Sequence, residues 1–157
     1  AIEDSALIGR KLADDTRVLC AAPSYLQAYG TPKTPDDLAS HRIIAFVNSK
    51  ARTLVAEENR TCVFPPSETP QRLVCDDGAS MRLATKAGVG ISMSSICSIH
   101  NELKDGSLVR VLSDYQVDDG SAIWLVYPKS NVLTAKVRVF IDFLIEKIGA
   151  PPIWERE

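Results

Sequence analysis

The sequence RLVCDDGASMRLATKAGVGISMSS, residues 72–95, decides the fold of this chain. An apolar run ends at Cys75, a helical pattern follows it, and a second apolar run covers residues 89–93. Asp77 is a suitable N-cap for the helix, and Gly88 suits the left-handed residue that commonly ends one. Two strands joined by a helix of this length normally form a right-handed parallel crossover. The stretch therefore predicts a β–α–β unit with a parallel sheet.

Strands and helices alternate along the rest of the chain, which is the α/β pattern. Further strands are predicted at residues 5–12, 17–22, 42–47, 108–112 and 122–127. A polar tip between residues 53–57 and 61–64 predicts a hairpin. Thr34, Pro35 and Asp37 begin a short helix, because they fit the cap, the first position and the acidic position of a capping box.

The last helix has the clearest pattern. Its apolar residues recur at helical spacing on one broad face, which consists of Leu133, Val137, Phe140, Ile141, Leu144, Ile145 and Ile148. Thr134 can cap this helix, and Gly149 with Pro151 can end it. A single broad apolar face predicts that the helix docks onto a sheet.

Composition excludes several classes of protein. The 157 residues suffice for one good core or two small lobes. A net charge of -2 without clustered Lys and Arg argues against a nucleic-acid-binding surface. No apolar run approaches the roughly 20 residues that a membrane helix needs. No signal peptide is recognised, although the abrupt start at Ala1 also fits a mature or truncated product.

The four cysteines are spaced poorly for zinc, because no C-x-x-C occurs and only two histidines accompany them. Cys20 and Cys75 lie in apolar runs, where free cysteine behaves as a small buried hydrophobe. Four reduced structural thiols are therefore expected, which favours a cytoplasmic location. A redox sensor or a disulfide is the alternative. No metal site and no cofactor are predicted.

Three loops that follow predicted strands carry the candidate ligand-binding residues Phe46, Asn48, Asp77, Gly78, Ala79, Ser94 and Ser95. If the strands are neighbours, these loops meet along one edge, where helix N-termini present free N–H groups. Phe46 would supply an apolar wall, Asn48 and the serines hydrogen bonds, and the amides after Asp77 a site for an anion. The alternative is that Asp77 and Ser95 only cap helices and that Asn48 only begins a turn.

No catalytic residue is predicted. Ser94 and Ser95 lack the G-x-S-x-G elbow, and His41 and His100 have no evident role as a base. The acidic pairs all lie at turns or helix starts, where Asp is favoured. An enzyme that used either serine would need a histidine within hydrogen-bond reach of its hydroxyl.

Several short motifs follow one another as they do in the effector-binding domain of LysR-type transcriptional regulators, which the chain resembles. They are DSAL (4–7), RKL (10–12), RVLCAAPSYL (17–26), TPDDL (34–38), DG (77–78), AGVGI (87–91), EL (102–103), GSLV (106–109), YP (127–128), KVR (136–138) and FIDFL (140–144). No single motif is diagnostic, but their order and spacing cover nearly the whole chain up to Gly149.

The resemblance implies a type 2 periplasmic-binding-protein-like fold, in which two crossover strands join two α/β lobes around an effector cleft. Residues 1–23 and 121–149 would form an incomplete first lobe with the crossover strands, residues 24–117 the second lobe, and residues 150–157 a C-terminal tail. The candidate loops match the cleft edge of the second lobe. The start of the first lobe and the helix-turn-helix that binds DNA in this family are absent from the chain.

The resemblance also implies a function. The domain would bind a small, anionic metabolite between its lobes and control DNA binding through the absent helix-turn-helix domain. The full-length protein would be a cytoplasmic homo-oligomer without a membrane partner. Many family members have Pro where this chain has Ser95, which favours a polar contact with the effector. A periplasmic solute-binding protein of a transporter has the same fold and is the alternative function.

Overall fold

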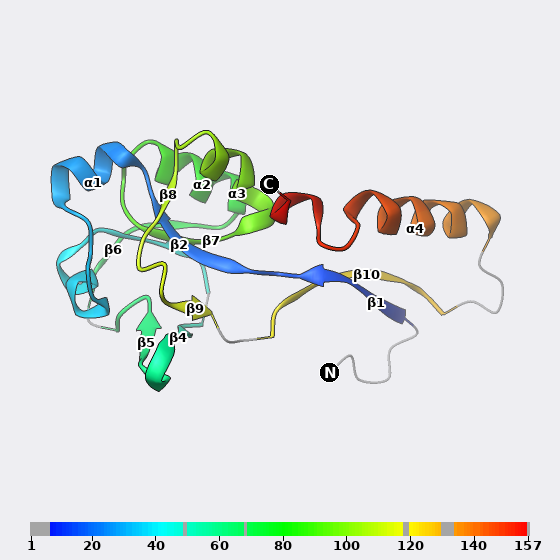
Figure 1. The fold of residues 1–157 in the computed structure, drawn as a ribbon, viewed down its shortest axis with the longest axis horizontal. Helices are drawn as coiled ribbons and strands as arrows, with labels where there is room; N and C mark the ends of the chain where they lie inside the picture. Colours follow the sequence, from blue (N-terminus) through cyan, green and yellow to red (C-terminus); the bar gives the residue numbers. More distant parts are fainter. Residues whose placement is uncertain (1–6, 49, 68, 118–119, 130–133, 157) are drawn as a thin grey trace. The chain divides into compact units, whose positions relative to one another are not determined.

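The computed structural model describes residues 7–48, 50–67, 69–117, 120–129 and 134–156 (Figure 1). Contacts divide the chain into two compact units, each of which is described by itself. The central unit is Thr16–Asp119, and the terminal unit combines Ala1–Asp15 with Gly120–Glu157. The lobe boundaries expected from the resemblance remain a prediction. Strands and helices alternate in the structure, which confirms the α/β class.

The elements of the central unit are short. Its strands are β2 (Arg17–Ala21), β3 (Ile43–Phe46), β4 (Arg52–Val55), β5 (Thr61–Phe64), β6 (Gln71–Cys75), β7 (Ser92–Ser95), β8 (Val109–Arg110) and β9 (Gln116–Val117). Its helices are α1 (Pro23–Tyr29), α2 (Gly78–Lys86) and α3 (Ile96–Lys104), with 3-10 turns η1 (Pro35–Ser40) and η2 (Glu57–Asn59). Figure 1 shows α2 and α3 on the same side of β2 and β7.

The central unit contains a parallel strand pair, as predicted. β3 pairs in parallel with β6, and Phe46 lies opposite Cys75 at the end of this ladder. At the start of β3, Ile43 also forms a parallel bridge with Ile91, which directly precedes β7. The β6–α2–β7 crossover is therefore confirmed, with β3 between its two strands.

The second strand of this crossover lies later than predicted. β7 begins at Ser92, whereas the sequence predicts a strand over residues 89–93. The Val89 N–H donates to the Ala84 carbonyl at 3.1 Å, within the turn that ends α2. Ser94 and Ser95 consequently lie inside a strand and not in the loop after it.

β2 is the middle strand of an antiparallel sheet with β7 and β8. Because successive side chains of a strand point to opposite faces, β2 contributes to two apolar cores. One core contains Leu19, Ala21, Tyr25, Leu38, Ile43, Leu54, Phe64, Ile91 and Val111. The other contains Val18, Cys20, Ala22, Ile99 and Leu108, and so attaches α3 to the sheet.

The predicted hairpin is also confirmed. β4 and β5 pair antiparallel across the polar turn η2, and β9 pairs with the other edge of β4. β8 has only two residues, fewer than the predicted strand over residues 108–112.

The terminal unit contains β1 (Leu7–Asp14), β10 (Ala122–Pro128), α4 (Ala135–Ile148) and the 3-10 turn η3 (Ile153–Glu155). β1 and β10 form a two-stranded antiparallel sheet. Thr134 caps α4, as predicted, because its Oγ1 accepts from the Val137 N–H at 3.5 Å. The helix ends at Gly149, whose N–H still donates to the Ile145 carbonyl.

The apolar face of α4 is buried much less than predicted. Of the predicted face, Ile141 is 6% exposed and Leu144, Ile145 and Ile148 are partly buried, but Val137 and Phe140 are 39% and 58% exposed. Leu133 lies outside the described residues. A two-stranded sheet offers little surface to a helix of this length, so the predicted face is fully buried only at Ile141 and partly buried at Leu144, Ile145 and Ile148.

All four cysteines are free, and Cys20 and Cys75 are buried. Burial raises the pKa of both thiols above its ordinary value. They therefore behave as small core residues, as expected from the apolar runs that contain them. Within the described ranges, each helix is too short or too polar to span a bilayer.

Candidate functional site

A cavity of about 510 Å³ opens in the central unit where β3 ends. Its apolar lining residues are Ile44, Ala45, Phe46, Val47, Phe64, Pro65, Met81 and Met93. Its polar lining residues are Asn48, Arg17, Lys50 and Arg52. We call it the cationic cavity, because these described residues bring three positive charges to it and no carboxylate.

The three cations come from different parts of the chain. Arg17 begins β2, Arg52 begins β4, and Lys50 lies two residues before Arg52. Positive charges near one cavity attract an anion to it. Arg and Lys side chains also form strong, charge-assisted hydrogen bonds to carboxylate and phosphate oxygens. The electrostatics of the cavity therefore favour a negatively charged ligand.

Phe46 and Asn48 line this cavity. Phe46 is the last residue of β3, and its side chain is 39% exposed. The Val47 N–H donates to the Cys75 carbonyl at 2.7 Å, after which Asn48 turns the chain with a φ of 53°. Asn adopts this left-handed conformation more readily than most residues. Asn48 thus both forms the turn and contributes to the cavity wall.

The two candidate serines lie on opposite faces of β7. Ser95 pairs with Arg17 in the ladder between β7 and β2, and Met93 is on the same face two residues earlier. Since Arg17 and Met93 line the cavity, Ser95 lies on the cavity side of the sheet. Ser94 is on the opposite face and is 5% exposed.

A network of buried hydroxyls occupies that opposite face. The Ser92 Oγ lies 2.8 Å from the Thr85 Oγ1, 3.3 Å from the Ser94 Oγ and 3.6 Å from the Cys20 Sγ. Thr85 also donates to the Met81 carbonyl at 2.7 Å. The network connects α2 with β7 and β2, and these elements carry Met81, Met93 and Arg17 to the cavity.

Asp77 acts as the N-cap of α2, which is the alternative that the sequence left open. Its Oδ1 accepts from the Ser80 N–H at 2.8 Å. Hydrogen bonds from Ser80 hold the pKa of the Asp77 carboxyl below its ordinary value. Asp77, Gly78 and Ala79 do not line the cationic cavity, and α2 reaches it one turn later through Met81.

Ten of the twelve cavity residues are not among the sequence candidates, and they include the three cations and both methionines: Arg17, Lys50, Arg52, Met81 and Met93. The sequence candidates lie in predicted loops after strands, whereas Arg17, Arg52 and Met93 lie within strands and Met81 lies within a helix. Positive charge in the sequence is the signal that indicates these residues, since Lys50 and Arg52 lie two and four residues after Asn48, where the candidate loop ends.

Neither histidine lies at the candidate serines. The His41 Nδ1 is 3.0 Å from the Tyr25 hydroxyl, and the His100 Nδ1 is 3.2 Å from the Cys97 carbonyl. The Ser95 hydroxyl is 3.0 Å from the Cys97 Sγ. The serine and histidine pair that an activated nucleophile requires is therefore not formed by these residues. In the part of the chain that the structure describes, no group of acidic, Cys or His side chains is arranged to hold a metal ion.

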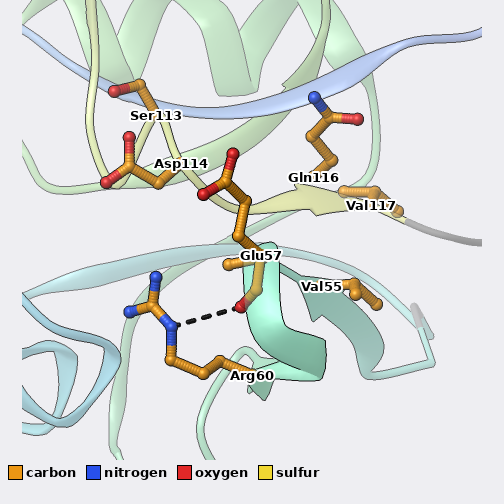
Figure 2. A pocket seen from close by; sticks show the side chains of 8 residues that line it. Val55, Glu57, Arg60, Ser113, Asp114, Gln116 and Val117 are labelled. Atoms are coloured by element: carbon orange, nitrogen blue, oxygen red, sulfur yellow. Dashed lines mark hydrogen bonds between the residues drawn. The ribbon is translucent and has the colours of Figure 1, made fainter.

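A second cavity, of about 710 Å³, lies between the turn after β4 and β9 (Figure 2). Glu57 and Asp114 bring carboxylates to it, and Arg60 brings a guanidinium whose Nε donates to the Glu57 carbonyl at 3.3 Å. These three side chains are exposed and of mixed sign. Because this lining selects no ligand charge and includes no sequence candidate, the cationic cavity is the better candidate site.

Comparison with known proteins identifies relatives along nearly the whole chain. The sequence profile of the LysR substrate binding domain matches residues 1–149. The HTH-type transcriptional regulator CrgA of Neisseria meningitidis is 28% identical over 152 residues, which are 94% of this chain and 49% of that protein. The HTH-type transcriptional activator AaeR of Escherichia coli is 31% identical over 149 residues, which are 93% of this chain and 47% of that protein. The chain thus spans about half the length of these curated relatives.

Solved structures give the same result. The regulatory domain of CrgA from Neisseria meningitidis superposes with a TM-score of 0.81 at 26% identity, covering 95% of this chain and 72% of that one. The regulatory domain of AphB from Vibrio vulnificus superposes with a TM-score of 0.75 at 30% identity, covering 93% of this chain and 71% of that one. These neighbours confirm the periplasmic-binding-protein-like fold of type 2. The chain belongs to the LysR substrate-binding domain family and is an effector-binding domain of the LysR-type transcriptional regulators.

Proposed function

We propose that the effector of this domain is a small anion that binds at the cationic cavity. One observation carries the proposal: Arg17, Lys50 and Arg52 surround a single cavity to which no described carboxylate contributes. The cavity lies where β3 ends, and ligands of α/β proteins commonly bind at the carboxyl ends of parallel strands. Phe46, Asn48 and Ser95 would contribute to the site, whereas Ser94 and Asp77 would support the elements around it.

The bound anion would control DNA binding by a helix-turn-helix domain outside this chain. CrgA and AaeR are named as HTH-type regulators, and this chain covers only about half of each. In the full-length protein, a cytoplasmic homo-oligomer, the cationic cavity would form one wall of the effector cleft. The ligand can shift the regulator between two arrangements only by its difference in affinity for them.

A periplasmic solute-binding protein of a transporter is the alternative that the fold alone allows. The relatives and structural neighbours described above are named as regulators, which does not favour a transport function. The same names agree with a protein that is not an enzyme. We therefore propose regulation by an effector as the function.

Chemical-shift mapping on the 157-residue chain tests the proposed site. Acetate, succinate and phosphate are titrated separately, with ethylammonium as the cationic control. We expect the anions to shift the amide signals of Phe46, Asn48, Lys50 and Met93, and Lys50→Met to weaken the binding. The matched control Lys104→Met removes a charge from the last turn of α3 and should leave the binding unchanged. Shifts centred on Glu57 and Asp114, or an equal response to ethylammonium, would contradict the proposal.

A further inference from the structure

The second cavity, which Figure 2 shows, has no part in the function proposed above. A lining of mixed sign selects no net charge, and so it suits a molecule that itself carries both signs. We propose that the second cavity is a separate binding site for a zwitterion, namely a small α-amino acid with an apolar side chain. The ammonium group binds to Glu57 and Asp114, the carboxylate binds to Arg60, and the side chain packs on an apolar wall.

Opposite charges share this cavity without forming an ion pair. Glu57 lies in the turn after β4, and Asp114 lies in the segment that leads into β9 (Figure 2). Among the described residues, no ion pair joins Arg60 to either carboxylate. Charges that are held apart attract an ammonium group and a carboxylate at different points of one cavity. An amino acid supplies both groups in one small molecule.

The Arg60 guanidinium is held in place by two contacts that leave its terminal nitrogens for a ligand. Its Nε donates to the Glu57 backbone carbonyl at 3.3 Å, and its central carbon lies 5.7 Å from the centre of the Tyr115 ring. The terminal nitrogens donate to none of the described residues. Two parallel N–H groups of a guanidinium match the two oxygens of a carboxylate. Arg60 is therefore suited to bind the carboxylate of an amino acid.

The turns that carry these groups have an unusual backbone. Glu58 and Asn59 have φ values of 60° and 57°, and Leu112 has a φ of 49°. Few residues other than glycine adopt this left-handed conformation, because it costs free energy. The Tyr115 N–H donates to the Leu112 carbonyl at 2.9 Å, which closes the second turn. The two carboxylates are thus fixed before a ligand binds, which reduces the entropy that binding costs.

The rest of the lining indicates an apolar side chain. Val55 and Gln116 lie opposite each other in the ladder between β4 and β9, so they share one face of the sheet. Val55, Ala56 and Val117 are the apolar part of the lining, and Figure 2 shows the two valines away from Asp114. A small aliphatic side chain such as that of valine gains contacts on this wall. The volume of about 710 Å³ is within the usual range for small-molecule sites.

Three related ligands separate the two charges in a titration of the 157-residue chain. Valine carries both charges, valinamide keeps only the ammonium group, and N-acetylvaline keeps only the carboxylate. The amide chemical shifts of Arg60, Asp114 and Gln116 report the second cavity, and those of Phe46 and Asn48 report the cationic cavity. At the second cavity, we expect valine to bind at least roughly 5-fold more tightly than either derivative, and at least roughly 3-fold more tightly than glycine.

Variants assign each charge of the ligand to its partner. Arg60→Met should weaken the binding of valine and N-acetylvaline at the second cavity and leave that of valinamide unchanged. Asp114→Asn should weaken valine and valinamide and leave N-acetylvaline unchanged. Arg110→Met and Asp76→Asn, at exposed positions outside the cavity, are the matched controls and should change none of the three.

The same titration can overturn the inference. Equal binding of valine and valinamide, or of valine and N-acetylvaline, would show that the cavity does not recognise a zwitterion. Valine that shifts only Phe46 and Asn48, or no residue at all, would show that the second cavity is not a site for amino acids. Neither result affects the proposed function, which is tested with acetate, succinate and phosphate at the cationic cavity.

Discussion

Thr85 is the residue on which the hydroxyl network behind the cavity depends. It donates to the Met81 carbonyl and lies 2.8 Å from the Ser92 hydroxyl, and its own side chain is fully buried. Thr85→Val keeps the shape and removes both hydrogen bonds, so the buried Ser92 hydroxyl keeps only its longer contacts. We expect a loss of about 1–3 kcal/mol in the free energy of unfolding, measured by urea denaturation.

Thr53→Val is the matched control for this substitution. Thr53 lies on the exposed face of β4, so the same change should alter the stability by no more than about 0.5 kcal/mol. Equal effects of the two variants would show that the hydroxyl network does not stabilise the domain.

His41 makes the stability depend on pH. Its side chain is largely buried beside the Tyr25 hydroxyl, and burial lowers its pKa below the ordinary value of 6.5 although Asp37 opposes this. The unfolded chain therefore binds a proton more readily than the folded chain does. The free energy of unfolding should therefore be highest above pH 6.5. It should decrease as the pH falls from 6.5 towards the lower pKa that His41 has in the folded chain.

Urea denaturation between pH 7.5 and 5 measures this dependence. His41→Gln should remove the decrease in the free energy of unfolding between pH 6.5 and 5. His100→Gln, at a partly buried position of α3, should retain that decrease. The lowered pKa values of Asp37, Asp77 and Asp105 affect stability only near their own, more acidic range. A stability that does not change between pH 7.5 and 5 would contradict the role given to His41.

At the scale of elements, Gly90 allows β3 to approach the chain that leads into β7. A Cβ on Gly90 would lie 2.3 Å from the Arg42 carbonyl oxygen, which accepts from the Ile91 N–H at 2.8 Å. Gly90→Ala should therefore separate the two segments and cost about 1–3 kcal/mol, measured as a lower midpoint of urea unfolding. Gly78→Ala, where a Cβ meets nothing within 4 Å, should be neutral or slightly stabilising. Equal costs at the two positions would contradict this account of the junction.

The β6–α2–β7 crossover was predictable because its signals are local. Asp77 caps the helix and an apolar run precedes it, as the sequence pattern requires. The limits of β7 were not predictable, because serines are typical of loops, whereas here Ser92 is buried against the Thr85 hydroxyl of α2 and the Cys20 thiol of β2, and Ser94 is buried against Ser92. The fold brings the partners on α2 and β2 to β7, so the sequence around β7 does not indicate them.

The same reason explains what was missed at the site. Phe46 and Asn48 are sequence candidates because they lie at the end of a predicted strand, and both line the cavity. Arg17 and Met93 face it through the alternation and register of two paired strands, neither of which is visible from residue type alone. The sequence thus predicted the edge of the sheet where the cationic cavity lies and not the charges that line it.

At the scale of the whole molecule, the exposed face of α4 should make the isolated chain associate. Val139, Phe140 and Phe143 form an apolar patch, and patches of this kind on soluble proteins normally contact another surface. We expect the sedimentation coefficient to rise with concentration and Val139→Lys with Phe143→Lys to abolish the rise. Leu83→Lys removes an equally exposed but separate apolar residue of α2 and should have no such effect. Unchanged association of the double variant would show that α4 is not the contact surface.

The central claim is that occupation of the cationic cavity controls DNA binding. It is tested most directly in a chain extended to the length of its relatives, by measuring affinity for its selected operator DNA with and without a saturating concentration of whichever of acetate, succinate and phosphate binds the cavity most tightly. We predict that this anion changes the operator affinity at least about 5-fold, as allosteric coupling of ordinary size does, and that Lys50→Met removes the change without altering DNA binding in the absence of ligand. An anion that occupies the cavity and leaves the operator affinity unchanged would contradict this claim.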